Sequence, residues 1–334
     1  GTKVDQGILT EGKFVLLGSN WWIRSGAAQY LQPGETPADA ANRFFVPVAY
    51  TDPFGSTIKV RYHSNRFLWI EQTENDLENK VTTELFNFYT LSPQRVRNEN
   101  NNLTEAIPDE LGLIKAMAML GKGNEGDELA GLTAHTDQAE KDLINDYWLV
   151  PETANGITDS VALHNLARQL LQHATVRFVY DFEAYTRSGG PVAVSAIMRE
   201  EHHTVDQQAK LWLSFEYSNG LGEMVMKKVQ AEPGEAQKAV VHPDNTVTIS
   251  TIDTAAQNPA QLRWIGNGRT VLNNKGNVVK QYEPYFSVSH RFENIKELVE
   301  TGSTSLFYYD AARRQVRTEM PGHSFSKTIY DSWQ

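Results

Sequence analysis

The chain has 334 residues, with 31 Lys+Arg against 41 Asp+Glu, and its formal net charge of −10 argues against a basic face for nucleic acid. The sequence contains no cysteine, which excludes disulfide scaffolds, thiolate zinc sites, iron–sulfur clusters and cysteine nucleophiles. With 40% hydrophobic residues it can bury a core, so we expect about two ordinary domains or one elongated β structure.

The first clear element is a turn followed by a strand. Residues 52–55, Asp-Pro-Phe-Gly, combine an aspartate that bonds its own backbone, a proline that presets φ and a glycine that accepts positive φ. The residues after this turn alternate strictly, with Ile58, Val60 and Tyr62 on one side and polar residues on the other. This alternation predicts a half-buried strand.

The same unit recurs along the chain, with Asp or Asn in the first position and Gly or a substitute in the fourth. The predicted turn residues are Asp52 and Gly55, Asn75 and Glu78, Asn98 and Asn101, Asp109 and Gly112, Asn219 and Gly222, Asn273 and Gly276, and Asp310 and Arg313, with Tyr309 preceding the last turn. The first three turns are 23 residues apart, which is the length of two short strands and their connections. Tyr309-Asp310 returns as Tyr330-Asp331 after 21 residues. We therefore expect hairpins laid side by side.

Three of these turns lack the expected glycine, because Glu78, Asn101 and Arg313 take its place. A residue with a Cβ resists the left-handed backbone, and Asn resists it least. We therefore expect these three turns to be widened or distorted, with Asn101 the mildest case.

Other stretches depart from the short repeat. Leu211–Gln230 predicts the clearest hairpin, with Leu211, Leu213, Phe215 and Tyr217 on one apolar face. Asp159–Ala174 predicts a helix with Asp159 as N-cap and a buried leucine stripe that leaves His164 and His173 in solvent. Gly121–Gly131 predicts a loop, and the polar stretch Glu232–Pro259 predicts a long excursion between strands.

These elements predict a mainly β fold, an antiparallel β-hairpin ribbon with one or two short helices. We expect a single segment over residues 1–334. Its β repeats occupy 1–120 and 175–334, and a loop and helix insertion occupies 121–174.

An ordered set of segments carries a family resemblance over Trp21–Gln334. The segments are Trp21–Gly26, Thr51–Gly55, Leu111–Leu113, Arg177–Asp181, Lys227–Gly234, Trp264–Asn277, Lys280–Ser287 and Phe307–Gln334. Together they resemble the shell-forming segment of the B component of bacterial insecticidal toxin complexes (Tc toxins), within the wider Rhs/YD-repeat group.

The resemblance implies a structural role without catalytic, cofactor-binding or metal-binding residues. In that family the B and C components build a hollow shell of spirally wound β-hairpins that encloses a cytotoxic segment. It implies a C-component partner that carries the toxin cargo, and a pore-forming A component reached through parts outside this chain. It also implies secretion within a toxin complex after synthesis in the bacterial cytoplasm. The start Gly1-Thr2-Lys3-Val4 does not resemble a signal peptide, and no apolar run is long enough to span a membrane.

Three motifs suggest chemistry but are better explained as structure. Residues 121–126 match Gly-x-Gly-x-x-Gly, yet acidic residues follow where a dinucleotide site needs a helix start, which favours a surface loop. Residues 47–55 resemble the element that marks self-cleavage in Rhs-type shells, but they lie near the start of the repeats, so Asp52 is interpreted as a turn former. Glu200-Glu201-His202-His203 is the only histidine cluster, and a metal site there would need distant partners.

The alternative reading is a secreted carbohydrate-binding or glycan-hydrolysing β protein. The chain's seven Trp and thirteen Tyr could stack on sugars, but aromatic residues also form cross-strand pairs in half-buried sheets. The repeated turn favours the shell segment, because a carbohydrate enzyme has no need of one turn along its whole sheet.

Overall fold

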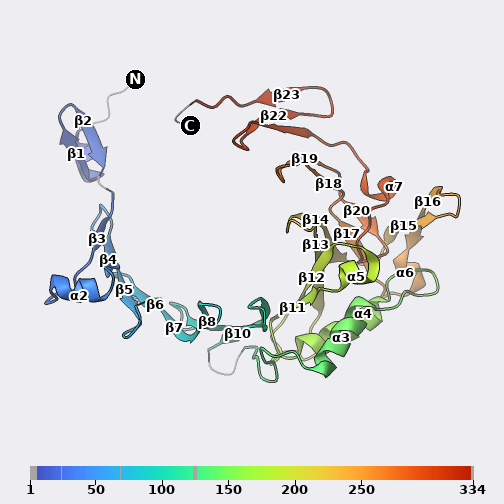
Figure 1. Cartoon of the computed structure of the whole chain (residues 1–334), viewed down its shortest axis with the longest axis horizontal. Helices are drawn as coiled ribbons and strands as arrows, with labels where there is room; N and C mark the ends of the chain where they lie inside the picture. The colour runs from blue at the N-terminus through green and yellow to red at the C-terminus, as the bar shows by residue number, and fades with distance from the viewer. Residues whose placement is uncertain (1–5, 24, 68, 123–125, 332–334) are drawn as a thin grey trace. The chain divides into compact units, whose positions relative to one another are not determined.

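The computed structural model describes residues 6–23, 25–67, 69–122 and 126–331 (Figure 1). Its strands are β1 (Phe14–Leu17), β2 (Asn20–Ile23), β3 (Ala27–Gln29), β4 (Ala49–Thr51), β5 (Thr57–Tyr62), β6 (Ile70–Glu74), β7 (Lys80–Asn87), β8 (Ser92–Arg97), β9 (Leu103–Pro108), β10 (Ile114–Gly121), β11 (Val176–Asp181), β12 (Val192–Arg199), β13 (Leu211–Ser218), β14 (Met224–Ala231), β15 (Glu235–Val241), β16 (Val247–Asp253), β17 (Arg263–Gly266), β18 (Thr270–Leu272), β19 (Val278–Gln281), β20 (Tyr285–Ser287), β21 (Leu306–Tyr309), β22 (Gln315–Glu319) and β23 (Phe325–Lys327). Its helices are α1 (Gln6–Glu11), α2 (Pro37–Asn42), α3 (Gln138–Trp148), α4 (Ser160–Leu171), α5 (Ala184–Ser188), α6 (Thr254–Gln257) and α7 (Lys296–Val299).

Most of the strands belong to one 16-stranded sheet. Its strand order is β16-β15-β20-β17-β14-β13-β12-β11-β10-β9-β8-β7-β6-β5-β4-β3, so successive strands are neighbours from β3 to β14. A two-stranded sheet, β1-β2, and a five-stranded sheet, β18-β19-β21-β22-β23, complete the β structure. The described pairings are antiparallel except that of β15 with β20. The predicted mainly β ribbon of hairpins is therefore confirmed.

The chain forms two compact units. Unit 1 comprises Gly1–Ile107 and Ala118–Asp127, and unit 2 comprises Pro108–Met117 and Glu128–Gln334. The predicted loop and helix insertion at 121–174 contains α3 and α4. The treatment of residues 1–334 as one shell segment stays a prediction.

One face of the unit 1 sheet carries ion pairs between neighbouring strands. The pairs are Lys59–Glu74, Lys80–Glu74, Arg97–Glu84 and Arg95–Glu105, with N–O distances of 3.9, 3.4, 2.7 and 2.7 Å. Each exposed pair is weak on its own. All of these pairs except Arg97–Glu84 join residues directly opposite each other in the ladder, and such pairs favour this strand register over a slipped one.

The other face of the same strands is apolar but only thinly covered. Val60 of β5 is buried and pairs with Thr73 of β6, which pairs with Val81 of β7. Ile58, on the same face, remains 49% exposed. Among the described residues of unit 1, no helix packs on β5–β9 (Figure 1). This part of the sheet is a single layer, and backbone pairing rather than a second layer holds it together.

Unit 2 has a conventional core on one face of its sheet. Helices α3 and α4 lie side by side and α4 packs on β11 and β12 (Figure 1). Burial alternates perfectly along β13, where Leu211, Leu213, Phe215 and Tyr217 are buried as predicted. The Phe215 ring lies 5.7 Å from Trp148 of α3. The helical layer and the sheet therefore meet through this aromatic contact.

The predicted helix at 159–174 is confirmed as α4, and Asp159 caps it by accepting the Ala162 N–H at 3.0 Å. The expectation that His164 is solvated is wrong, because its Nε2 lies 3.0 Å from Gln230 Oε1. His173 is 44% exposed and pairs with Glu128 at 2.8 Å.

Two expectations about secondary structure are wrong. The number of helices was underestimated, since seven lie within the described residues and α3 was not predicted at all. The stretch Glu232–Pro259 is not an excursion but mostly the antiparallel hairpin β15–β16. The prolines of this stretch lie outside β15 and β16, so they do not remove any hydrogen bond between the two strands.

A buried ion pair fastens the loop after β20 to the sheet. Lys228 of β14 is fully buried and contacts Glu293, which also accepts hydrogen bonds from Tyr285 Oη and Ser287 Oγ at 2.8 Å each. Burial lowers the pKa of Lys228, while Glu293 opposes that shift. A buried carboxylate needs such saturated bonding to be tolerated.

No helix in the described ranges combines the length and apolarity needed to cross a membrane.

Phe215→Ala tests the helix-covered core. We expect a loss of about 3–5 kcal/mol in unfolding free energy, because the substitution leaves a cavity where the sheet meets α3. Trp212→Ala is the matched control, since Trp212 is a half-buried aromatic residue on the opposite face of β13 and should cost much less. Urea denaturation monitored by circular dichroism measures both losses, and equal losses would contradict a core on one face only.

Candidate functional site

The repeated turns are built from one backbone arrangement. The first residue donates its N–H to the fifth carbonyl, and the fourth N–H donates to the first carbonyl, at 3.1 and 3.0 Å in the Asn75 turn. The side-chain Oδ1 of Asn75 also accepts the N–H groups of Leu77 at 2.9 Å and Asn79 at 3.1 Å. Since Asp and Asn are the residues that bond their own backbone two residues on, they suit this position.

All seven predicted turns have these contacts. Their first residues are Asp52, Asn75, Asn98, Asp109, Asn219, Asn273 and Asp310. The seven form one structural set spread over both units. The chemistry of this set is purely hydrogen bonding.

The fourth residue of each of the seven predicted turns has a left-handed backbone conformation, with positive φ. The φ values are 97° at Gly55, 62° at Glu78, 65° at Asn101, 83° at Gly112, 78° at Gly222, 77° at Gly276 and 66° at Arg313. The expectation of widened turns at the three non-glycine positions is wrong, because their hydrogen bonds match those of the glycine turns. The side-chain and backbone bonds hold the turn even where the fourth residue carries a Cβ that disfavours it.

Strand direction places the unit 1 turns at the same end of the strands. The turns at 52–55, 75–78 and 98–101 are each separated by two antiparallel strands, so the chain returns to that end of the sheet every 23 residues. The connections that contain residues 63–67 and 88–91 consequently lie at the opposite ends of these strands. Asp76 adds a link between neighbouring turns, because its Oδ2 accepts the Thr57 N–H at 2.5 Å.

In unit 2, three turns are in contact with their neighbours. A Cβ on Gly276 would lie 1.7 Å from an oxygen of Glu223, which directly follows the 219–222 turn. Lys275 Nζ donates to the Ala311 carbonyl at 2.9 Å in the next turn. The positive φ of Gly276 favours glycine, whereas the nearby Glu223 carboxylate is the end of a flexible side chain that can move.

Tyr309 and Tyr330 each donate a hydrogen bond from the side-chain hydroxyl to a backbone carbonyl. Tyr309 Oη donates to the Val278 carbonyl at 2.7 Å, and Tyr330 Oη donates to the Gln315 carbonyl at 3.2 Å. Each tyrosine thereby links its segment to a preceding strand of the five-stranded sheet.

Three further turns have the same backbone but were missed. Thr153, His242 and Met320 occupy the first position, where none can supply a carboxylate or amide oxygen. The fourth residues have a left-handed backbone, with φ 67° at Gly156 and 62° at both Asn245 and His323. The usable signal for the His242 turn was the Pro-Asp-Asn run in 243–245, which is typical of turns.

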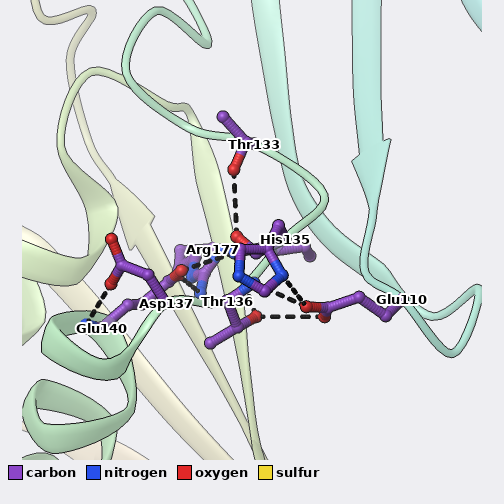
Figure 2. A network of polar contacts seen from close by, with 8 residues as sticks. Glu110, Thr133, His135, Thr136, Asp137, Glu140 and Arg177 are labelled. Carbon is purple, nitrogen blue, oxygen red and sulfur yellow. Dashed lines mark hydrogen bonds and ion pairs between the residues drawn. The ribbon is translucent and has the colours of Figure 1, made fainter.

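The turn at 109–112 is attached to the loop that precedes α3 (Figure 2). Glu110 Oε1 accepts the Thr136 N–H at 2.7 Å and lies 2.8 Å from His135 Nδ1. The Thr136 N–H bond is the largest cause that lowers the pKa of Glu110 to about 2. The loop is held in turn by Thr133, whose hydroxyl donates to the His135 carbonyl at 3.0 Å.

Two buried cations share one carboxylate on α3. Asp137 caps α3 through the Glu140 N–H at 2.9 Å, and Glu140 then pairs with Lys115 at 2.6 Å and with Arg177 at 2.5 Å. Lys115 and Arg177 are 3% and 2% exposed, and burial lowers the pKa of Arg177. This arrangement fixes α3 on β10 and β11. Sequence reasoning missed it, although Asp137 followed three residues later by Glu140 is a helix-start signal.

These buried groups border a pocket of about 470 Å³, lined by the 109–112 turn, α3 and β11. Glu140 pairs with both cations, which leaves this trio with a net positive charge, and Asp181 is paired with Arg187. These ion pairs join α3 to β10 and β11, and β11 to α5.

The motifs that suggested chemistry are characterised by the contacts that their residues make. Residues 123–125 of the Gly-x-Gly-x-x-Gly match lie outside the described residues, and the next helix begins only at Gln138. Asp52 Oδ1 is engaged by the N–H groups of Phe54 and Ser56, both at 2.9 Å. His203 stacks on His173 at 3.9 Å. Across the described ranges no group of three or more potential metal ligands gathers.

Several large aromatic residues pack on one another, while others, such as Trp22 and Tyr185, are exposed. Trp69 stacks on Phe86 with centroids 4.2 Å apart, and Trp264 is fully buried beside Phe215 at 5.5 Å. These are the cross-strand and core contacts expected of a half-buried sheet.

Comparison with solved structures gives a match over nearly the whole chain. The crystal structure of TcdB2-TccC3 matches with a TM-score of 0.64 at 16% identity, covering 99% of this chain and 15% of that chain. TcdB2-TccC3-Cdc42 and TcdB2-TccC3 without its hypervariable C-terminal region match with TM-scores of 0.61 and 0.62 at 14% identity. Each of these two covers 98% of this chain and 17% of that chain.

This chain has the fold of a segment of a Tc toxin B/C complex. It spans only 15–17% of the length of the solved chains that it matches. The sequence-based resemblance to Tc toxin shell segments is thereby confirmed at the level of fold. No model of a known protein family matches the sequence, and no curated protein matches it.

The two glycines of the 219–222 turn provide a matched test of the backbone. Gly222→Ala should cost about 1–2 kcal/mol, because Ala is strained at a φ of 78°, whereas space around the new Cβ is open. Gly220→Ala meets equally open space without a left-handed φ, so it should be neutral or stabilise slightly. Thermal unfolding of both variants measures the difference, and equal melting temperatures would contradict the turn geometry.

Glu110→Gln tests the attachment of the 109–112 turn. The folded pKa of about 2 is below the usual 4.5, so the ionised carboxylate stabilises the fold above pH 4.5, and this contribution is lost as the pH falls toward 2. We expect the melting temperature of the wild type to exceed that of the variant near neutral pH and the gap to close on acidification. A gap that is constant over this range would show that the charge of Glu110 contributes nothing.

Proposed function

We propose that this chain is a wall segment of a β-shell that encapsulates a cytotoxic effector and helps to deliver it. The observation that carries this proposal is the superposition of 98–99% of the chain on part of the TcdB2-TccC3 structures. The proposal assigns the chain no catalytic step. Its function lies in the sheet itself.

The construction of unit 1 supports a barrier function. A wall must separate two spaces without a thick core, and β5–β8 form a single layer with ion pairs on one face and apolar residues on the other. The two faces present different chemistry, so each can meet a different environment. Backbone pairing keeps such a layer continuous.

We infer that the partner is a C-component shell protein that carries the toxin cargo, as the B–C composition of the TcdB2-TccC3 structures suggests. A pore-forming A component would be reached through parts outside this chain. In this proposal the segment acts outside the producing bacterium after assembly in its cytoplasm. Neither nucleic acid nor membrane insertion by this segment has a part in it.

Co-expression with a TccC-type shell protein tests the proposal. We expect the tagged chain to retain that protein through affinity purification and to elute with it as one complex in size-exclusion chromatography with light scattering. An unrelated β-rich protein of similar size serves as the control partner.

Separate elution of the two proteins would contradict the proposed partnership. A glycan array run on the same preparation distinguishes the carbohydrate-binding alternative. Specific binding of a glycan there would overturn the shell assignment.

A further inference from the structure

Three asparagines of the chain are followed directly by glycine, and they are Asn155, Asn219 and Asn267. This dipeptide is chemically labile, because the backbone nitrogen of the glycine can attack the side-chain carbonyl of the asparagine. Glycine has no side chain that obstructs the attack. The fold gives the three sites different surroundings, which decide whether the reaction can proceed.

The turn at 219–222 holds the side chain of Asn219 ready for this attack. Asn219 Oδ1 accepts the N–H groups of Leu221 at 2.9 Å and of Glu223 at 3.0 Å. These bonds fold the side chain back over its own main chain, so its carbonyl carbon lies beside the Gly220 nitrogen. Two N–H groups on the carbonyl oxygen also stabilise the negative charge that develops there during the attack, as in an oxyanion hole.

Gly220 is free to act as the attacking group. Among the described residues, no carbonyl accepts the Gly220 N–H, since the turn uses the N–H groups of its first, third, fourth and fifth residues. Gly220 is exposed, and a Cβ placed on it would meet nothing within 4 Å. The neighbouring Leu221 is 83% exposed, so water reaches the site.

The fold restrains the other two sites. The Gly156 N–H is already donated to the Thr153 carbonyl at 2.8 Å. Gly268 is buried, and a Cβ placed on it would lie 2.5 Å from the carbonyl oxygens of both Tyr282 and Glu283. The chain around Gly268 therefore has little room to move, and water has little access to it.

We propose that Asn219 is a site of spontaneous deamidation. The Gly220 nitrogen forms a bond to Cγ of Asn219, the bond from Cγ to Nδ2 breaks, and ammonia leaves with the proton of the Gly220 N–H. Water then opens the cyclic imide at either carbonyl, which leaves aspartate or isoaspartate at position 219. This reaction is independent of the proposed shell function.

Glu223 makes the product unfavourable for the turn. Asn219 Nδ2 donates to Glu223 Oε2 at 3.1 Å, and an aspartate would replace this donor with a second carboxylate. The turns that begin with aspartate avoid such repulsion, because their fifth residues are Ser56, Leu113 and Arg314. Isoaspartate also lengthens the main chain by one carbon within the turn. Deamidation therefore weakens the β13–β14 hairpin.

Ageing the full chain at mildly alkaline pH tests the proposal. The three Asn-Gly pairs lie in separate tryptic peptides, so mass spectrometry measures each rate. We expect Asn219 in the folded protein to react at least about tenfold faster than Asn155 and Asn267. In urea the three rates should become similar, because only the fold distinguishes the sites. Equal rates in the folded protein, or an Asn219 that reacts only in urea, overturn the proposal.

Gly220→Ala is the matched control for the chemistry. Its Cβ obstructs the attacking nitrogen, while the open space and the absence of a left-handed φ leave the turn intact. The variant should lose most of the deamidation at Asn219 and keep the rates at Asn155 and Asn267. An unchanged rate at Asn219 in the folded variant overturns attack by the Gly220 nitrogen.

Asn219→Asp reproduces one product and tests its effect on the hairpin. We expect a lower melting temperature than that of the wild type at neutral pH, because two carboxylates then face each other. The same substitution in a Glu223→Gln background should lower the melting temperature less. An equal loss in both backgrounds overturns the effect assigned to Glu223.

Discussion

The structure depends on a carboxylate or amide oxygen that accepts two backbone N–H groups within its own turn. In the Asp52 turn these bonds run from Phe54 and Ser56, and the same pair recurs in six other predicted turns. The bonds close the turn locally, so contacts within the turn itself fix the register of each hairpin. A sheet assembled in this way can extend strand by strand without a central core. Its stability is then distributed along the ladder.

Both units contain this turn, but different additional contacts stabilise their sheets. Unit 1 adds ion pairs such as Lys80–Glu74 across a single layer, whereas unit 2 covers its sheet with α3 and α4 around Phe215. Unit 2 also contains buried charge, in Lys228 with Glu293 and in the cations that share Glu140. Removing one partner of such a pair leaves an uncompensated buried charge, so these sites hold the helices and loops in one position. The sheet is therefore a single layer in one unit and is covered by helices in the other.

Local chemistry made much of this architecture predictable. The turn residues, the alternation along β13 and the cap of α4 each depend on a few adjacent side chains whose preferences are strong. The strand pair β15–β16 was missed because its first turn residue is His242, which lacks the usual oxygen, while its prolines resembled a loop. Helix α3 was missed because its packing stripe is interrupted by charged residues, and these find their partners only across β10 and β11. Contacts of this kind join residues far apart in sequence, so spacing alone cannot reveal them.

Hydrogen exchange measured by mass spectrometry tests most directly whether backbone pairing alone holds the single-layer sheet. The account predicts slow exchange for the paired amides of β6 and β7 and for the turn amides of Leu77 and Asn79, although no helix covers them. It also predicts fast exchange at the Asp76 amide of the same turn, which donates no bond within the turn pattern. Uniformly fast exchange across residues 57–97, with protection confined to the helix-covered strands, would contradict the account.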